Sequence, residues 1–145
     1  MRVMALDIGE KRIGVAISDI DARIASPLTV LPGPISAAVS SLKRLAEDYE
    51  IGVLLVGLPL TFAGEEGPQA TRVRNEVSIL GSALGLPMTF VDERLSSIEA
   101  KRSMGNAGVS DRKQRGKVDM VAAAIILQTY LDSGGPARDG IHRDD

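Results

Sequence analysis

The chain has 145 residues, with no cysteine, no tryptophan and a single histidine, His142, which lies within the last four residues. The lack of cysteine excludes disulfides and thiolate metal sites, and it is typical of proteins from a reducing compartment. With one histidine so close to the end of the chain, we expect neither a Ser-His triad nor a histidine-based metal site. Any chemistry must therefore rely on carboxylates, Lys, Arg or hydroxyl groups.

Aromatic residues make up only 3% of the chain, so the core must be built from Val, Ile, Leu and Ala, and no aromatic platform for stacking bases is obvious. No apolar run is long enough to span a membrane, and the run before Asp7 is too short for the core of a signal peptide. We therefore expect a soluble, cytoplasmic protein with no membrane partner. The length predicts one domain over residues 1–133, and Gly134-Gly135-Pro136 opens a predicted flexible tail over 134–145.

Hydrophobic patterning predicts five strands and four helices in the order β-β-β-α-β-α-β-α-α. The expected strands are Val3–Leu6, Ile13–Ser18, Ala22–Leu31, Ile51–Val56 and Met88–Val91, and the expected helices are Ile35–Glu50, Pro68–Leu84, one that begins near Ser96, and Asp111–Leu131. Early hairpin-like strands followed by βαβ crossovers predict an α/β fold with a five-stranded mixed sheet and helices on both faces.

Two acids follow predicted strands. Asp7 ends the first strand, where it could cap a turn or could equally bind a ligand at the carboxyl edge of the sheet. Glu93 follows the fifth strand beside Asp92, just before the helix predicted from Ser96. These two acids could favour the positive end of that helix, but Ser96 and Glu99 already have the spacing of a capping box. The additional acids are therefore candidates for a site.

Asp119 belongs to the last long helix, and its neighbours three, four and seven residues later are Ala122, Ala123 and Ile126. An aspartate on this stripe faces the body of the protein, where a bare carboxylate is costly to desolvate. A metal ion would relieve that cost. Arg115, one turn earlier, could do so instead as the partner in a structural ion pair.

Basic residues are concentrated between Arg94 and Lys117, where seven of them stand against two acids in a chain of net charge −2. Such a segment suits a polyanion, although a solvated helix face has the same composition. Our candidate nucleic-acid contacts are Arg94, Arg112, Lys113 and Arg115 in this segment and Lys11 and Arg12 in the turn after Asp7. Lys11 and Arg12 could also be no more than surface charges on a hairpin.

Three carboxylates suit Mg²⁺ or Mn²⁺, which prefer a few carboxylates together with water and phosphate oxygens. A pair of such ions can activate water and stabilise the leaving oxygen of a phosphodiester without a nucleophilic side chain. Two other classes stay open. A nucleotide-binding ATPase of the actin and sugar-kinase type also begins with a strand, an Asp and a glycine turn, but it needs two lobes. A non-catalytic nucleic-acid or ribosome-binding module would have purely structural acids.

Four motifs in order resemble the signatures of the YqgF/RuvX family of Holliday-junction resolvase-like proteins, over residues 3 to about 131. They are Asp7-Ile8-Gly9 with Arg12-Ile13-Gly14-Val15-Ala16, Val56-Gly57-Leu58-Pro59-Leu60 with Gly64, Asp92-Glu93-Arg94-Leu95-Ser96, and Val118-Asp119 with Ala122-Ala123 and Ile125-Ile126-Leu127-Gln128.

The resemblance implies an RNase H-like fold and a nuclease that matures the 5′ end of the 16S ribosomal RNA precursor, with four-way DNA junctions as the older assignment. It places the catalytic, metal-binding acids at Asp7, Glu93 and Asp119. It also implies structured RNA, branched DNA and ribosomal precursor particles as partners, and a monomer or homodimer. The wider superfamily usually has an acid on or just after the fourth strand, where this chain has Gly57-Leu58. Glu93 must therefore substitute for that acid.

Overall fold

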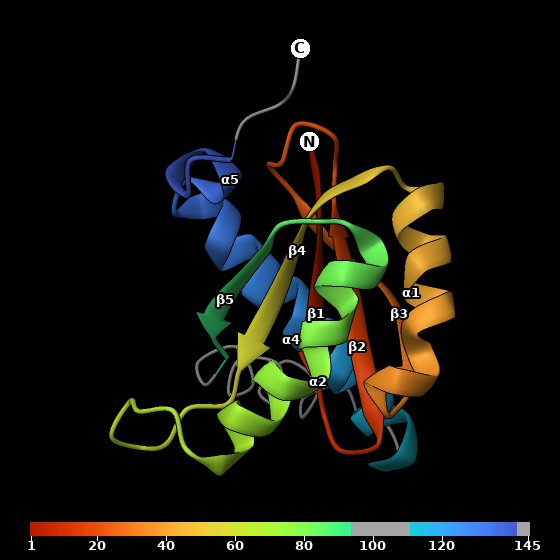
Figure 1. Cartoon of the computed structure of the whole chain (residues 1–145), viewed down its shortest axis with the longest axis vertical. Helices are drawn as coiled ribbons and strands as arrows, with labels where there is room; N and C mark the ends of the chain where they lie inside the picture. The colour runs from red at the N-terminus through yellow and green to blue at the C-terminus, as the bar shows by residue number, and fades with distance from the viewer. Residues whose placement is uncertain (94–110, 142–145) are drawn as a thin grey trace.

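The computed structural model describes residues 1–93 and 111–141, and for residues 111–118 it describes the backbone alone. The elements are β1 (Arg2–Ile8), β2 (Arg12–Ser18), β3 (Ala25–Pro32), α1 (Ile35–Asp48), β4 (Ile51–Leu58), α2 (Pro68–Leu84), β5 (Met88–Asp92), α4 (Asp111–Asp132) and α5 (Gly135–Arg138) (Figure 1). The predicted strands and the helices before and after the undescribed segment are confirmed, with ends that differ by up to three residues. The helix predicted to begin near Ser96 lies outside the described residues.

The five strands form one sheet in the order β3-β2-β1-β4-β5. β2 runs antiparallel to both β1 and β3, whereas β4 runs parallel to both β1 and β5. The predicted mixed sheet is therefore confirmed. The parallel strands β1, β4 and β5 bring their carboxyl ends to one edge, at the bottom of Figure 1.

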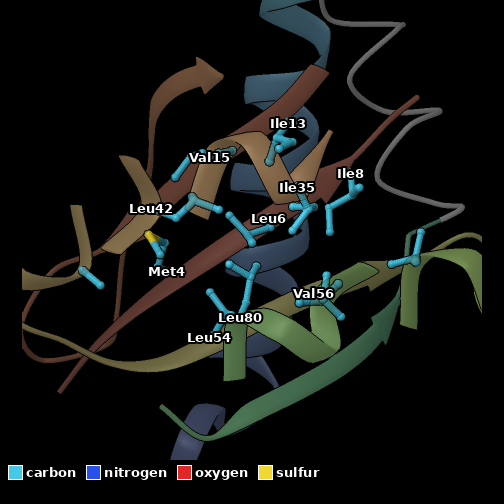
Figure 2. Close-up of a cluster of buried hydrophobic side chains, with 14 of the residues drawn as sticks. Met4, Leu6, Ile8, Ile13, Val15, Ile35, Leu42, Leu54, Val56 and Leu80 are labelled. Carbon is cyan, nitrogen blue, oxygen red and sulfur yellow. The ribbon is translucent and has the colours of Figure 1, made fainter. Parts of the chain in front are cut away.

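Helices α1 and α2 cover one face of the sheet, and α4 crosses the other face (Figure 1). The alternation of side chains along β1 divides the core accordingly. Met4, Leu6 and Ile8 pack with α1 and α2, in the cluster drawn in Figure 2. Val3 and Ala5 belong to the cluster formed with α4. Because neighbouring strand residues point to opposite faces, Asp7 follows Val3 and Ala5 onto the α4 face.

The last long helix, α4, has 22 residues. No helix within residues 1–93 and 111–141 is long and apolar enough to cross a membrane.

After α4, where we expected the flexible tail to begin, the structure instead has the short helix α5. Its first residues, Gly135 and Pro136, are buried, and the Tyr130 hydroxyl donates a hydrogen bond of 2.8 Å to Asp139. These contacts tie the segment to α4, which glycine content alone did not indicate.

Candidate active site

Two glycines decide how closely the acidic residues approach one another. Gly14 of β2 is the register partner of Asp7 in β1. A Cβ atom added at Gly14 would lie 2.1 Å from the carbonyl oxygen of Asp119, which no side chain could tolerate. The lack of a side chain therefore lets the backbone of α4 rest directly on the sheet. As a result, Asp119 lies beside Asp7 although 112 residues separate them in the sequence.

Gly57 near the end of β4 plays the same part for Glu93. The backbone N–H of Glu93 donates to the carbonyl oxygen of Leu58 at 3.2 Å, which holds it at the end of the strand. A Cβ at Gly57 would lie 3.1 Å from the Glu93 Cβ, 3.2 Å from its Oε2 and 2.9 Å from Cδ1 of Ile126. Glu93 thus fills the space that a side chain on β4 would occupy. This placement explains how an acid that follows β5 can substitute for the acid that β4 lacks.

Asp7 and Glu93 behave as a pair. Burial, the hydrogen bond to Asp7 and the Asp7 charge together raise the pKa of Glu93 to about 9. The pKa of Asp7 is also raised, first by burial and further by the charge of Asp119, while the hydrogen bond with Glu93 opposes the shift. The pair therefore retains a proton at neutral pH, and Glu93 donates it to Asp7.

The Oε2 atom of Glu93 is buried and has no hydrogen-bond donor among residues 1–93 and 111–141. An ionised, buried oxygen without a donor is costly, which is why the proton stays on the pair. A cation placed there would compensate the charge in place of the proton. These carboxylates are also the oxygen donors that Mg²⁺ and Mn²⁺ prefer. The residues present therefore fit the predicted ion.

Asp119 makes a different contact. Its Oδ2 accepts a hydrogen bond of 2.7 Å from Nε of Arg12, and the two side chains are 22% and 38% exposed. The sequence suggested Arg115 for this role, but the described partner is Arg12, and the side chain of Arg115 lies outside the described part. Ala122, Ala123 and Ile126 are buried, as the stripe on the helix predicted. The aspartate therefore stands at the edge of an apolar contact with the sheet.

The predicted acids thus converge, but they do not form a ready-made set of ligands. Within residues 1–93 and 111–141, no three His, Asp or Glu side chains are arranged to hold a metal ion. The three acids lie close to one another, since the charges of Asp7 and Asp119 both act on Glu93. What the sequence did not indicate is the division into an Asp7–Glu93 pair and an Arg12–Asp119 ion pair.

The predicted nucleic-acid contacts are only partly described. Lys11 is exposed in the turn beside Asp7, and Arg12 begins β2, where its carbonyl oxygen accepts a hydrogen bond from Gly9. Arg94 lies outside the described residues. The other three predicted contacts lie at the beginning of α4, where the structure describes the backbone alone. They are Arg112, Lys113 and Arg115.

Sequence reasoning missed the function of the two glycines. It noted Gly14 and Gly57 as parts of two family motifs but gave neither a role in bringing the acids together. In the structure, Gly14 contacts Asp119, and the space above Gly57 is taken by Glu93 and Ile126. The available signal for Gly14 was its place inside the predicted strand Ile13–Ser18, where a glycine often marks the close approach of another segment. Gly57 gave no such signal, because the predicted strand ended at Val56, whereas β4 extends to Leu58.

Comparison with known proteins agrees with this architecture. Residues 1–133 match the family RuvX, described as Holliday junction resolvase. A protein of Chloroflexus aggregans, named "Putative pre-16S rRNA nuclease", is 46% identical over 132 residues, which cover 90% of this chain and 93% of that protein. A protein of the same name from Roseiflexus sp. strain RS-1 is 48% identical over 133 residues, covering 91% and 94%.

Among solved structures, RuvC of T. thermophilus in complex with a Holliday junction substrate has a TM-score of 0.58 at 13% identity, and the similarity covers 92% of this chain and 96% of that chain. At this identity the similarity concerns the fold, and it confirms the predicted RNase H-like fold. The family match over nearly the whole chain and the identities of its relatives show that this chain belongs to the RuvX family.

Proposed function

We propose that the protein is a divalent-metal-dependent nuclease, with Asp7, Glu93 and Asp119 as its catalytic acids. The observation that carries the proposal is the Asp7–Glu93 pair at the carboxyl edge of the sheet, where a buried carboxylate oxygen has no donor within the described part of the chain. Open α/β sheets bind their ligands at that edge. Perturbed, mutually interacting carboxyls in such a position are typical of functional sites.

Asp7 and Glu93 would hold the metal ion, and Asp119 would complete the set. When bound, Mg²⁺ or Mn²⁺ supplies an activated water and a positive charge against the phosphodiester oxygens. Asp7 and Glu93 would hold the ion in place of the proton that Glu93 otherwise retains. No cysteine is present and the single histidine is near the end of the chain, so a mechanism without a nucleophilic side chain suits this composition.

Lys11 and Arg12 would contact the backbone of the nucleic acid, since they lie in the turn that follows Asp7. Phosphate contacts of this kind fix the position of the strand without reading its sequence. Contact with the nucleic-acid backbone stays a prediction for Arg94 and for the three basic residues at the start of α4, which are Arg112, Lys113 and Arg115.

The names of the relatives favour precursor 16S ribosomal RNA as the substrate. A nuclease with this substrate would act in the cytoplasm, on ribosomal precursor particles. The family description favours a four-way DNA junction as the second candidate. Both substrates are phosphodiesters, so the same acids would serve for either. The difference lies in the surface that docks the substrate.

The test is to incubate the protein with precursor 16S rRNA and with a synthetic four-way junction, with and without Mn²⁺. We expect Mn²⁺-dependent cleavage of the rRNA, which Asp7→Asn abolishes while its thermal unfolding stays cooperative. Asp21→Asn is the matched control, because Asp21 is an exposed acid in the loop between β2 and β3, away from the site. Cleavage of the junction alone would make DNA the substrate. Full cleavage by Asp7→Asn would contradict the proposed mechanism.

A further inference from the structure

The ion pair between Arg12 and Asp119 occupies an oxygen of one of the three acids. Nε of Arg12 lies 2.7 Å from Oδ2 of Asp119, a charge-assisted contact between the start of β2 and the middle of α4. A carboxylate oxygen in that contact is not open to a cation, and the guanidinium charge would repel one nearby. This pairing holds Asp119 to Arg12 rather than to the Asp7–Glu93 pair, in keeping with the lack of a three-acid arrangement in the described part of the chain.

The fold does not depend on this ion pair. Helix α4 is held by the contact of its backbone with Gly14 and by the burial of Ala123, Ile126 and Leu127. Arg12 is held through its backbone, which pairs with Pro32 in β3 and closes the turn from Gly9. Its side chain is 38% exposed, and half-exposed ion pairs add little to stability. The guanidinium can therefore leave Asp119 at low cost.

A guanidinium has the geometry to bind a phosphate through two parallel hydrogen bonds, which a lysine cannot match. A nucleic-acid backbone that enters the site would bring such a phosphate next to the turn of Lys11 and Arg12. Transfer of Arg12 to that phosphate would free Asp119 beside Asp7 and Glu93. The negative charge at the site would then rise at the moment when substrate is present.

We propose that Arg12 is a positioning residue that exchanges Asp119 for a backbone phosphate, so that the third acid becomes available to the metal ion only when nucleic acid is bound. This inference rests on the proposed function. It makes the binding of metal and of nucleic acid mutually favourable, because coupling between two ligands is reciprocal. It also assigns to one residue two opposite effects that a purely structural arginine would not have.

The first measurement is Mn²⁺ affinity without nucleic acid, by isothermal titration calorimetry, for the wild-type protein, Arg12→Gln and Lys11→Gln. We expect Arg12→Gln to bind Mn²⁺ about fivefold more tightly, which is the effect of releasing a partly exposed ion pair. Lys11→Gln is the matched control, since it removes a positive charge from the same turn but frees no acid. Its gain should be clearly smaller. Asp119→Asn introduced into Arg12→Gln should cancel the gain, because the two residues interact directly.

The second measurement is the binding of precursor rRNA in EDTA, where no cleavage takes place. Arg12→Gln should bind the RNA more weakly than the wild type, so one substitution shifts the two affinities in opposite directions. An Mn²⁺ affinity of Arg12→Gln equal to or below that of the wild type would overturn the inference. If wild-type Mn²⁺ binding is meanwhile lost in Asp7→Asn, the proposed function stands and only the exchange is wrong. If neither the wild type nor Arg12→Gln shows Mn²⁺ binding that depends on Asp7, the proposed function and the exchange both fail.

Discussion

Replacement of Gly14 by alanine should separate α4 from the sheet at the point where Asp119 meets Asp7. The new Cβ would lie 2.1 Å from the carbonyl oxygen and 2.4 Å from the carbonyl carbon of Asp119, and 3.0 Å from the backbone nitrogen of Met120. All three are backbone atoms, so no change of rotamer can relieve the clash. Contacts of a Cβ are essentially never shorter than 3.0 Å, so the helix must move by about 1 Å.

Overpacking of this kind costs about 1–3 kcal/mol of stability. The cleavage rate should be affected more strongly than stability, because a displacement of about 1 Å in a catalytic group can lower the rate about 100-fold. Gly14→Ala should therefore remain folded at 25 °C, unfold at a lower temperature, and lose most of its Mn²⁺-dependent cleavage. Thermal unfolding monitored by circular dichroism and single-turnover cleavage measure the two effects separately.

Gly52→Ala is the matched control, because Gly52 lies in β4, on the other side of β1 from β2. The three atoms nearest to a Cβ at Gly52 all belong to the flexible side chain of Met1, whereas those nearest to a Cβ at Gly14 are backbone atoms. We expect this variant to cleave like the wild type. Wild-type stability and cleavage in Gly14→Ala would refute the close contact between α4 and β2. Lower stability together with wild-type cleavage would show that cleavage does not require Asp119 to lie beside Asp7.

Three other outcomes follow from the described contacts. The pKa of Glu93 is raised from its ordinary 4.5 to about 9, so between pH 4.5 and pH 9 the folded, metal-free protein binds a proton that the unfolded chain releases. The free energy of unfolding should therefore fall as pH rises from 4.5 to 9, by up to about 1.4 kcal/mol per pH unit. Urea unfolding should show this slope in the wild type and a flatter one in Glu93→Gln. Tyr130→Phe removes the hydrogen bond to Asp139 that ties α5 to α4, and should cost about 1 kcal/mol in urea unfolding without changing cleavage; an unchanged midpoint would show that the bond adds nothing. Three basic residues lie at the start of α4: Arg112, Lys113 and Arg115. Neutralising them together should weaken nucleic-acid binding and flatten its dependence on salt concentration. An unchanged salt slope in a binding titration would show that they form only a solvated surface.

The sequence predicted those features that depend on local patterns. The apolar run from Ile51 predicted β4, and the apolar run before Asp7 predicted β1, with Asp7 at its end. The end of a strand at the carboxyl edge of the sheet made Asp7 a candidate for binding a ligand. Family resemblance independently selected the same acids.

The features that the sequence did not predict depend on contacts between distant segments. Arg12 and Asp119 are 107 residues apart, and their pairing depends on where α4 crosses the sheet. The position of that crossing is set by Gly14, whose role is visible only once the strand register places it opposite Asp7. The hydrogen bond from Tyr130 to Asp139, which holds α5 against α4, likewise could not be predicted, because the glycines at 134 and 135 indicated a flexible tail.

The most direct test of the account is the affinity of the protein for Mn²⁺, measured by electron paramagnetic resonance on the wild type, Asp7→Asn and Glu93→Gln. Shared coordination by these two acids predicts that each substitution alone weakens binding by about tenfold or more, while Asp21→Asn leaves it unchanged. Wild-type affinity in both Asp7→Asn and Glu93→Gln would contradict the claim that acids from separate strands meet around one cation.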